Sequence, residues 1–239
     1  MPVQAHFFPV RTRAQHIPHP LAKALLGSCL VVLCWASTVS HAADAAPPGN
    51  TGRTPQVTEA RDTPQFIAWV RATNNHRGQP FAVIDKKAAM LHVFDAAGRV
   101  RGSSPVLLGL AVGDDSVPGI GQRKMSEIRP DERTTPAGRF ASEPGVNLQG
   151  EDIVWIDYDA AVSMHRVRAS NKADRRLERL ATPTAADNRI SYGCVNVPAA
   201  FYDAQIKPVF GARAAVVYVL PETRPAGSVF GVIAGRTAS

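Results

Sequence analysis

ISYGCVNV, residues 190–197, contains the cysteine on which the interpretation of this 239-residue chain depends, Cys194. The glycine before Cys194 permits a tight turn, and the apolar residues after it are typical of a strand. The other two cysteines, Cys29 and Cys34, lie in an apolar segment near the N-terminus that we expect to be removed. A single thiol in an exported protein has no internal disulfide partner, so it is either inert or reactive. We interpret Cys194 as a nucleophile.

The first 42 residues predict a secretory signal peptide. They combine a basic N-terminal region, an uncharged apolar segment at 24–36, and the small residues Ser40 and Ala42 at the positions that a signal peptidase reads. The alternative is an uncleaved inner-membrane anchor, but the apolar segment is shorter than the roughly 20 residues that a membrane span needs. The predicted localisation is therefore the periplasm.

The charge balance of the chain narrows the classes of partner. Three of the 27 lysine and arginine residues lie in the predicted signal peptide, which has no acidic residue, so 24 remain against 20 acidic residues. The resulting mild positive charge has no long block of one sign and gives no indication of nucleic-acid binding. It is compatible with peripheral association with an anionic polymer such as the cell wall. One thiol excludes a disulfide-stapled fold, so apolar burial has to supply the core.

Changes in composition divide the chain into five predicted segments. Small and helix-breaking residues such as Pro47, Pro48 and Gly49 predict a linker without regular structure. Thr63 is expected to cap a helix that has Pro64 at its first position. The predicted segments are a signal peptide (1–42), a disordered linker (43–64), a short N-terminal helix (65–79), a catalytic domain (80–221) and a C-terminal tail (222–239).

Apolar runs between turn residues predict a mostly β domain with short α-helices in the connections. The predicted strands are 81–85, 90–94, 106–112, 135–140, 153–158, 161–167 and 214–219. Helices are predicted at 172–180 and from Pro198 to about Lys207. Residues 113–135 predict a long loop, and loops of this length in compact domains are usually functional or mobile.

A cysteine nucleophile reacts as its thiolate, so Cys194 needs a base or a positive field nearby. Three histidines follow the predicted signal peptide. His76 lies in a polar stretch before the domain, and His92 lies within a strand, where it can simply be packed. His165 lies at the end of an apolar strand, so its ring can emerge at the edge of a sheet. We predict that His165 is the base, and the alternative is an ordinary surface histidine at a strand end.

The residues around the cysteine are further candidates. Gly193 is predicted to let the backbone present amide N–H groups to an oxyanion, and the alternative is an ordinary turn glycine. Ser191 and Tyr192 are candidates for positioning a substrate or for orienting the base, and either could equally be a plain strand residue. Asn196 is predicted either to bind substrate or to cap the following helix.

Three features together resemble the L,D-transpeptidase (YkuD-like) catalytic domain. They are His165 at its strand end, TPAGRF at 135–140 and SYGCVN at 191–196, in the family's order, and the resemblance covers roughly residues 81–220. It implies a β-sandwich-like domain with a cysteine-containing cleft under a mobile loop. It also implies that Cys194 is the nucleophile, that His165 is the general base, and that the amides of Gly193 and Cys194 are the oxyanion donors.

The resemblance also implies a reaction. The family's cysteine attacks the peptide stem of peptidoglycan at the carbonyl of its third residue, releases the terminal D-amino acid and forms a thioester. An amine acceptor then resolves the thioester, so the implied partners are donor and acceptor stem peptides, and neither a metal nor an organic cofactor is expected. Hydrolysis of the same thioester would make the protein an L,D-carboxypeptidase. A non-catalytic wall-binding module of the same fold is a further alternative.

The chain departs from the family pattern in three places. Tyr192 stands where the family usually has histidine, although base orientation there is largely attributed to a backbone carbonyl near this position, which any residue can supply. Arg166 stands where a glycine commonly follows the catalytic histidine. The spacing from His165 to Ser191 is longer than is typical, because of the basic insert 171–188. We expect this insert to be a solvated helix, and the alternative is a lid or an acceptor-side surface.

Overall fold

The structure is a computed structural model that describes residues 62–231. The predicted signal peptide (1–42), most of the predicted linker (43–64) and the last eight residues of the predicted tail lie outside the described residues. Between residues 62 and 231, no helix combines the length and the apolar character that a membrane span requires.

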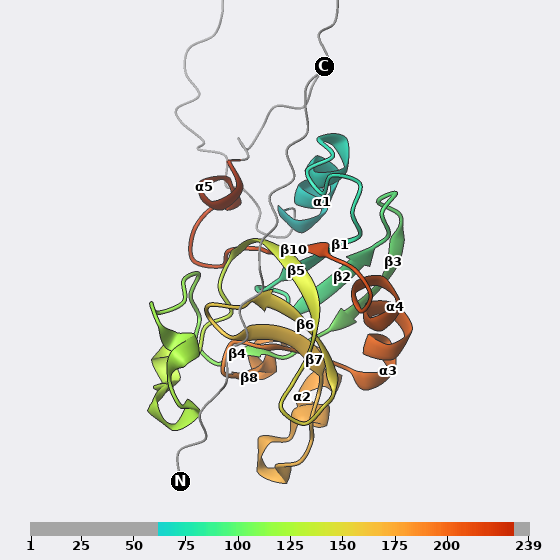
Figure 1. Ribbon diagram of the computed structural model, residues 1–239. Helices are drawn as coiled ribbons and strands as arrows, with labels where there is room; N and C mark the ends of the chain where they lie inside the picture. Colours follow the sequence, from blue (N-terminus) through green and yellow to red (C-terminus); the bar gives the residue numbers. More distant parts are fainter. Residues whose placement is uncertain (1–61, 232–239) are drawn as a thin grey trace, which may run out of the picture. The chain divides into compact units, whose positions relative to one another are not determined.

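An eight-stranded sheet with the order β3-β2-β1-β10-β5-β6-β7-β9 dominates the described part, and β4 and β8 form a second, two-stranded sheet (Figure 1). The strands are β1 (Phe81–Asp85), β2 (Met90–Phe94), β3 (Val100–Pro105), β4 (Leu108–Gly109), β5 (Gly138–Val146), β6 (Asp152–Asp157), β7 (Val162–Arg166), β8 (Arg189–Ser191), β9 (Val195–Val197) and β10 (Ala215–Val219). The helices are α1 (Asp62–Ala72), η2 (Ile120–Gln122), η3 (Met125–Glu127), η4 (Pro130–Glu132), η5 (Lys172–Asp174), α2 (Arg176–Ala181), η6 (Ala185–Asn188), α3 (Ala199–Phe201), η7 (Tyr202–Ile206), α4 (Lys207–Phe210) and α5 (Ala226–Phe230). The predicted class, mostly β with short helices, is confirmed.

The long strand β5 joins the two halves of the large sheet. Its first part pairs antiparallel with β10, from Gly138 to Ser142, and its second part pairs antiparallel with β6, from Glu143 to Val146. On one side, β10 continues into β1 as a parallel pair, and β2 and β3 follow. On the other side, β7 pairs with β6, and β9 lies parallel to β7 at the sheet edge. This parallel pair brings two segments that are distant in the sequence together.

The core lies on both faces of the β1–β10 half because alternate residues of a strand point to opposite faces. In β1, Ala82 and Ile84 enter the larger core, which also takes residues from the β6–β7–β9 half. Phe81 and Val83 enter a smaller core on the other face, against α1. Members of the larger core include Leu91, Val93, Val154, Met164, Val195, Val197, Tyr202, Phe210 and Val217.

The helix α1 begins and ends earlier than the predicted helix at 65–79. It spans Asp62–Ala72, so Thr63 lies inside it and does not act as its cap. The Thr63 Oγ1 hydroxyl instead donates a hydrogen bond to Asp85 Oδ2 at 2.6 Å. Phe66 and Val70 are buried, and their spacing of four residues places them on the same face of the helix. This face covers the smaller core.

The two helices predicted beside the cysteine are present with changed limits. The insert holds η5 and α2, which ends at Ala181, close to the predicted end at 180. The helix expected from Pro198 to about Lys207 runs as α3, the π-helical η7 and α4 as far as Phe210. The side chains of Tyr202 and Ile206, which both belong to this helix, are buried in the larger core.

The strand predicted at 106–112 is regular only at Leu108 and Gly109. The segment changes partners along its length: Leu107 exchanges backbone hydrogen bonds with Asn196, and the Leu110 N–H donates to the Ser191 carbonyl at 2.9 Å. The buried run 106–108 therefore reflects its position under the cysteine-bearing segment and not membership of a long strand. The preceding strand β3 was not predicted, because VRGSSP carries no apolar alternation.

A buried cluster of charges ties the start of the long loop to the C-terminal segment. Lys86 is fully buried, and its ammonium lies 2.8 Å from Asp114 Oδ1 and 3.4 Å from Glu222 Oε1. The ammonium also donates to the carbonyls of Gly113 and Thr135. Arg189 pairs with Glu222 and donates to the Lys86 carbonyl at 2.9 Å. Two cations and two carboxylates therefore balance one another inside the fold.

The Asp114 carboxylate is the acceptor at the centre of this cluster. Burial alone would raise its pKa, but hydrogen bonds from Lys86, from Thr223 and from the Glu222 amide lower it well below its ordinary value. The Thr223 hydroxyl donates to Asp114 Oδ2 at 2.5 Å, and the Glu222 N–H donates to Oδ1 at 2.7 Å. The segment that the sequence assigns to the C-terminal tail is thus anchored at its first residues.

A second contact fixes the same C-terminal segment further on. Phe230, in α5, lies with its ring centroid 4.6 Å from that of Phe66 and 6.2 Å from that of Tyr218. The described part of the predicted tail, up to Gly231, therefore packs against the smaller core.

Candidate active site

The parallel register of β7 and β9 places Cys194 beside His165. His165 is the register partner of Asn196, and Met164 is the partner of Val195. Met164 and Val195 are buried in the larger core, so the neighbouring positions in each strand point to the opposite face. That face receives His165 from one strand and Cys194, which immediately precedes β9, from the other. The two residues predicted as base and nucleophile are thus brought together.

The Cys194 thiol lies among groups that can stabilise a thiolate. The neighbouring His165 imidazole lowers the pKa of this thiol. The Ser163 N–H donates to Sγ at 3.5 Å, and the Ser163 hydroxyl lies 3.6 Å from Sγ. The Ala161 carbonyl accepts a hydrogen bond from the protonated thiol at 3.6 Å, so this contact favours the thiol and not the thiolate. Cys194 as a whole residue is half-buried.

A backbone carbonyl determines which ring nitrogen of His165 faces the thiol. His165 Nδ1 lies 2.7 Å from the Arg166 carbonyl oxygen. Because a carbonyl can only accept, Nδ1 carries the proton and donates it to this oxygen. Nε2 is then the nitrogen that can accept the Cys194 proton. The carbonyl that orients the base belongs to Arg166, the next residue in the chain, and not to a residue near Tyr192, as the resemblance suggested.

The electrostatics of the pair favour proton transfer from sulfur to nitrogen. Burial alone would raise the pKa of Cys194, but its hydrogen bond with His165 and the histidine's charge lower that pKa below the ordinary value for a thiol. Burial alone would lower the pKa of His165, but the hydrogen bond with Cys194 and the charge of Cys194 raise it above its ordinary value. Each group therefore stabilises the charged form of the other, which is the arrangement that an activated thiol needs.

The turn before the cysteine requires glycine at position 193. Gly193 has a φ of +125°, and a Cβ there would lie 2.8 Å from the Thr134 carbonyl oxygen, so any side chain would be strained and would clash. The Gly193 carbonyl accepts from Thr135 Oγ1 at 2.8 Å, and Thr135 Oγ1 accepts from the Gly109 N–H at 2.9 Å. The TPAGRF run therefore contributes Thr135 as a brace of the turn, a role that we did not predict.

Gly193 was also predicted to supply an oxyanion donor. Its N–H instead donates to Ser191 Oγ at 3.1 Å, so this amide is engaged within the turn in the present structure. Of the two amides that the resemblance implied, that of Cys194 remains the candidate.

The hydroxyl of Ser191 and the side-chain amide of Asn196 both hold the carbonyl of the cysteine. Ser191 Oγ donates to the Cys194 carbonyl at 2.6 Å, and Asn196 Nδ2 donates to the same oxygen at 3.2 Å. Both residues are buried. The alternative role of Asn196 as a cap of the next helix is wrong, because α3 has Pro198 at its N-cap and no side-chain cap. Direct contact of either residue with substrate stays a prediction.

The insert is attached to the cysteine-bearing segment through an arginine. Arg176 Nη1 donates to Asn196 Oδ1 at 2.7 Å, and Arg176 Nε lies 2.9 Å from Asp174 Oδ2. Arg179 likewise donates to the carbonyls of Asp174 and Asp187. The insert is therefore more than the solvated helix that we expected, since two of its arginines point inward. A charge count could not separate these from its exposed basic residues.

Arg166, the second departure from the family pattern, is held on both sides by carboxylates. Its Nε lies 2.9 Å from Asp203 Oδ1, and its Nη1 lies 3.2 Å from Asp152 Oδ1. The guanidinium carbon also lies 4.3 Å from the ring centroid of Tyr202. The hydrogen bonds that Arg166 donates to Asp203 and Asp152 raise its pKa. The Arg166 carbonyl orients His165, so the two carboxylates that hold Arg166 also help to position the base.

Tyr192, at the position where the family usually has histidine, lies under an arginine of the long loop. The Arg133 guanidinium carbon is 3.9 Å from the centroid of the Tyr192 ring. Both residues are half-buried. The sequence offered no signal for this contact, because the two residues are far apart in the chain.

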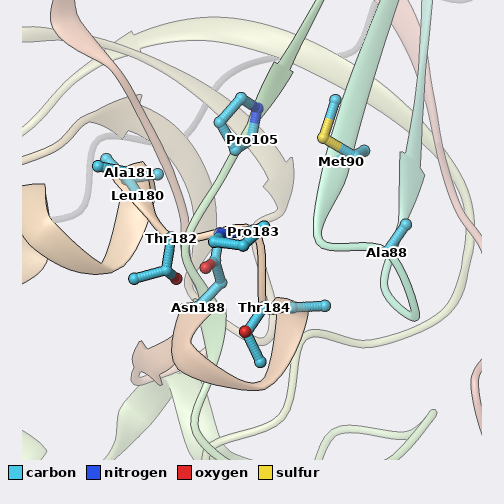
Figure 2. Close-up of a pocket in the computed structure, with 10 residues that line it drawn as sticks. Ala88, Met90, Pro105, Leu180, Ala181, Thr182, Pro183, Thr184 and Asn188 are labelled. Carbon is cyan, nitrogen blue, oxygen red and sulfur yellow. The ribbon is translucent and has the colours of Figure 1, made fainter.

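A cavity of about 350 Å³ lies elsewhere, between the insert and the β2–β3 edge. Figure 2 shows Met90 and Pro105 on one side of it and residues from the insert on the other. Asn188 Nδ2 donates to the Val106 carbonyl at 2.9 Å, whereas its buried Oδ1 has no hydrogen-bond partner in the described part of the chain. Neither Cys194 nor His165 lines this cavity, so we do not include it in the candidate site.

Comparisons with known proteins give similarity to solved structures alone. No protein-family model matches the chain, and no curated protein matches its sequence. The similar structures include the helical cell shape determining protein Pgp2 from Campylobacter jejuni (13% identity, TM-score 0.41, 61% of this chain and 49% of that chain), the catalytic domain from E. faecium L,D-transpeptidase (17%, 0.33, 61% and 99%) and an L,D-transpeptidase from Mycobacterium smegmatis (17%, 0.32, 59% and 58%). The chain spans about half the length of the first of these.

Proposed function

We propose that the chain is a thiol acyltransferase of the L,D-transpeptidase type that acts on peptidoglycan stem peptides through a thioester on Cys194. One observation carries the proposal: the parallel β7–β9 pair places Cys194 beside His165, whose Nδ1 is fixed by a backbone carbonyl so that Nε2 is left free to accept a proton. This is the arrangement of nucleophile, base and orienting group that covalent catalysis requires. The substrate class comes from the sequence resemblance at 135–140 and 191–196, and the export that it requires comes from the predicted signal peptide.

The first half of the cycle forms the acyl-enzyme. His165 Nε2 takes the proton of Cys194, and the thiolate attacks the carbonyl carbon of the amide between the third and fourth residues of the donor stem. A C–S bond forms and the carbonyl oxygen becomes an oxyanion, for which the Cys194 N–H is the proposed hydrogen-bond donor. The intermediate collapses, the C–N bond breaks, and His165 returns its proton to the leaving amine. The terminal D-amino acid departs and a thioester remains.

The second half transfers the acyl group. An acceptor amine gives a proton to His165 as it attacks the thioester carbonyl, so that a C–N bond forms and the C–S bond breaks. The released thiolate recovers its proton from His165, and the free enzyme returns. Because the same histidine acts in both halves, the Arg166 carbonyl that orients it serves every proton transfer.

Product analysis tests this function and its outcome. Purified protein is incubated with a disaccharide-tetrapeptide, with and without an added D-amino acid as acceptor, and the products are separated and weighed by mass spectrometry. We expect products in which the terminal D-amino acid has been replaced by the acceptor amine, and none from the Cys194→Ala variant. A tripeptide alone would make the protein an L,D-carboxypeptidase. Unchanged substrate with folded protein would contradict the proposal.

A further inference from the structure

Three basic residues of the long loop 113–135 form ion pairs within the loop, and a fourth, Arg133, does not. Arg123, Lys124 and Arg129 each pair with a carboxylate of the same loop: Arg123 with Glu132, Lys124 with Glu127, and Arg129 with both Asp131 and Glu132. Arg133 forms no ion pair with any residue between 62 and 231. A half-buried cation without a counter-charge is uncommon, because buried charges are usually paired, and this makes Arg133 a candidate for binding an anion.

The contacts of Arg133 fix the orientation of its guanidinium relative to the Tyr192 ring. Nε and Nη2 donate to the Ile128 carbonyl at 3.3 and 3.2 Å, and the group lies over the ring of Tyr192. Nη1 has no hydrogen-bond partner in the described part of the chain. Stacking on an aromatic ring leaves the N–H groups of a guanidinium in their plane, and because Ile128 takes the Nε side, the Nη1 end is the part of Arg133 that can donate to a carboxylate.

The backbone of Arg133 is fixed against the catalytic turn. Its carbonyl accepts from the Ala111 N–H at 3.0 Å, and the next two residues contact Gly193, Thr134 through its carbonyl and Thr135 through its hydroxyl. Tyr192 is two residues from Cys194, so their Cα atoms are at most about 7.6 Å apart. The platform that holds the guanidinium therefore belongs to the same turn as the nucleophile.

The proposed reaction brings a carboxylate to this region. The donor's terminal residue, which is released, has a free α-carboxylate that a single Cα separates from the nitrogen of the scissile amide. It is thus the charged group of the donor that lies closest to the reacting carbonyl.

We infer that Arg133, held over Tyr192, binds the free α-carboxylate of the donor peptide's terminal residue and so selects donors with an unblocked C-terminus. The inference rests on the proposed function, and it gives the tyrosine at position 192 a role as the platform for the guanidinium.

The test compares two donors, a tetrapeptide with a free C-terminus and the same peptide as its C-terminal amide. The rate of Cys194 acylation is followed by intact-mass spectrometry for both peptides with the full chain. We expect the wild type to favour the free acid by about 10- to 100-fold, the range for a hydrogen bond to a charged group. Arg133→Gln should lose most of this preference, and Arg133→Lys should keep part of it.

Two further variants separate the inference from a general effect on the loop. Arg129→Gln removes an exposed, paired arginine of the same loop and should keep the wild-type preference. Tyr192→Leu removes the platform but keeps the charge, and it should reduce the preference even if Arg133→Gln does not fold. Thermal unfolding of each variant checks the fold.

Two results would overturn the inference and leave the proposed function standing. One is equal acylation of the wild type by the acid and the amide, and the other is an undiminished preference in both Arg133→Gln and Tyr192→Leu. The absence of acylation by either peptide would overturn the proposed function, and this inference with it.

Discussion

Replacing His165 by asparagine lowers the rate of Cys194 acylation by about 10²- to 10⁴-fold, the range for loss of a general acid–base group. The change removes the hydrogen bond and the charge that lower the pKa of Cys194. Burial still raises the pKa of the thiol, and the histidine no longer offsets it, so the pKa of Cys194 is higher in the variant. The pH at which alkylation by iodoacetamide reaches half its maximal rate therefore moves upward in the variant.

The alkylation profile gives this prediction its control. In the wild type we expect the inflection to lie below the ordinary thiol pKa of about 8.5, and in His165→Asn above its wild-type position. His92→Asn is the matched variant, because His92 lies on β2 and its Nδ1 is 2.8 Å from the Ser103 hydroxyl, away from the cysteine. It should leave the profile unchanged. A His165→Asn profile that coincides with the wild type would show that the histidine does not activate the thiol.

Replacing Lys86 by methionine destabilises the fold by about 3–5 kcal/mol, the cost of removing one partner from a buried ion pair. The substitution leaves the buried Asp114 without the cation that pairs with it, and leaves Glu222 paired with Arg189. Because Asp114 holds the Glu222–Thr223 segment, the loss should appear as a lower free energy of unfolding in urea. Arg99→Met is the control, since Arg99 is highly exposed in its pair with Asp95, and the cost there should be below about 1 kcal/mol.

The pH dependence of stability follows from the lowered pKa of Asp114. A depressed carboxyl pKa stabilises the fold above the unfolded pKa, and this contribution is lost as pH falls through the folded value. Without Lys86 the pKa of Asp114 rises towards its unfolded value, so the folded and unfolded states bind protons more alike. The stability lost between neutral and acidic pH should therefore be smaller in Lys86→Met than in the wild type. Equal unfolding free energies for the two proteins at neutral pH would show that the cluster contributes little.

The nucleophile and the base could be predicted because each has a local signal. Cys194 follows a glycine and precedes a strand, so it was expected at a tight turn. His165 ends an apolar strand, so its ring was expected at the edge of a sheet. Their register, with His165 opposite Asn196 in a parallel pair, comes from the packing of the β7–β9 crossover. The orientation of the imidazole comes from a carbonyl, and the sequence cannot show which carbonyl faces a ring.

The roles of the supporting residues could not be predicted, because they depend on contacts between distant segments. Thr135 reaches Gly193 from the other side of the turn, and Arg176 reaches Asn196 from the insert. Arg133 and Tyr192 meet although nothing in either local sequence indicates it. Such pairs form where the fold brings two polar side chains together, and hydrophobic periodicity carries no information about them.

The strands also divide into those that the apolar pattern predicts and those that depend on backbone pairing. Phe81–Asp85, with its buried β-branched and aromatic residues, was predicted with its observed limits. The edge strand Val100–Pro105 was missed because it is mostly polar and exposed and is held by backbone pairing with β2. Residues 106–112 were predicted as one strand because they are apolar, although their backbone turns from one partner to the next.

Intact-mass spectrometry of the protein after incubation with a tetrapeptide-stem muropeptide or a carbapenem tests the central claim most directly. The account predicts a covalent adduct on the wild type, with the mass of an acyl group that has displaced the thiol hydrogen. It predicts no adduct on Cys194→Ala. The absence of an adduct from folded wild-type protein with both reagents, or an adduct of equal yield on Cys194→Ala, would contradict the assignment of Cys194 as an acylating nucleophile.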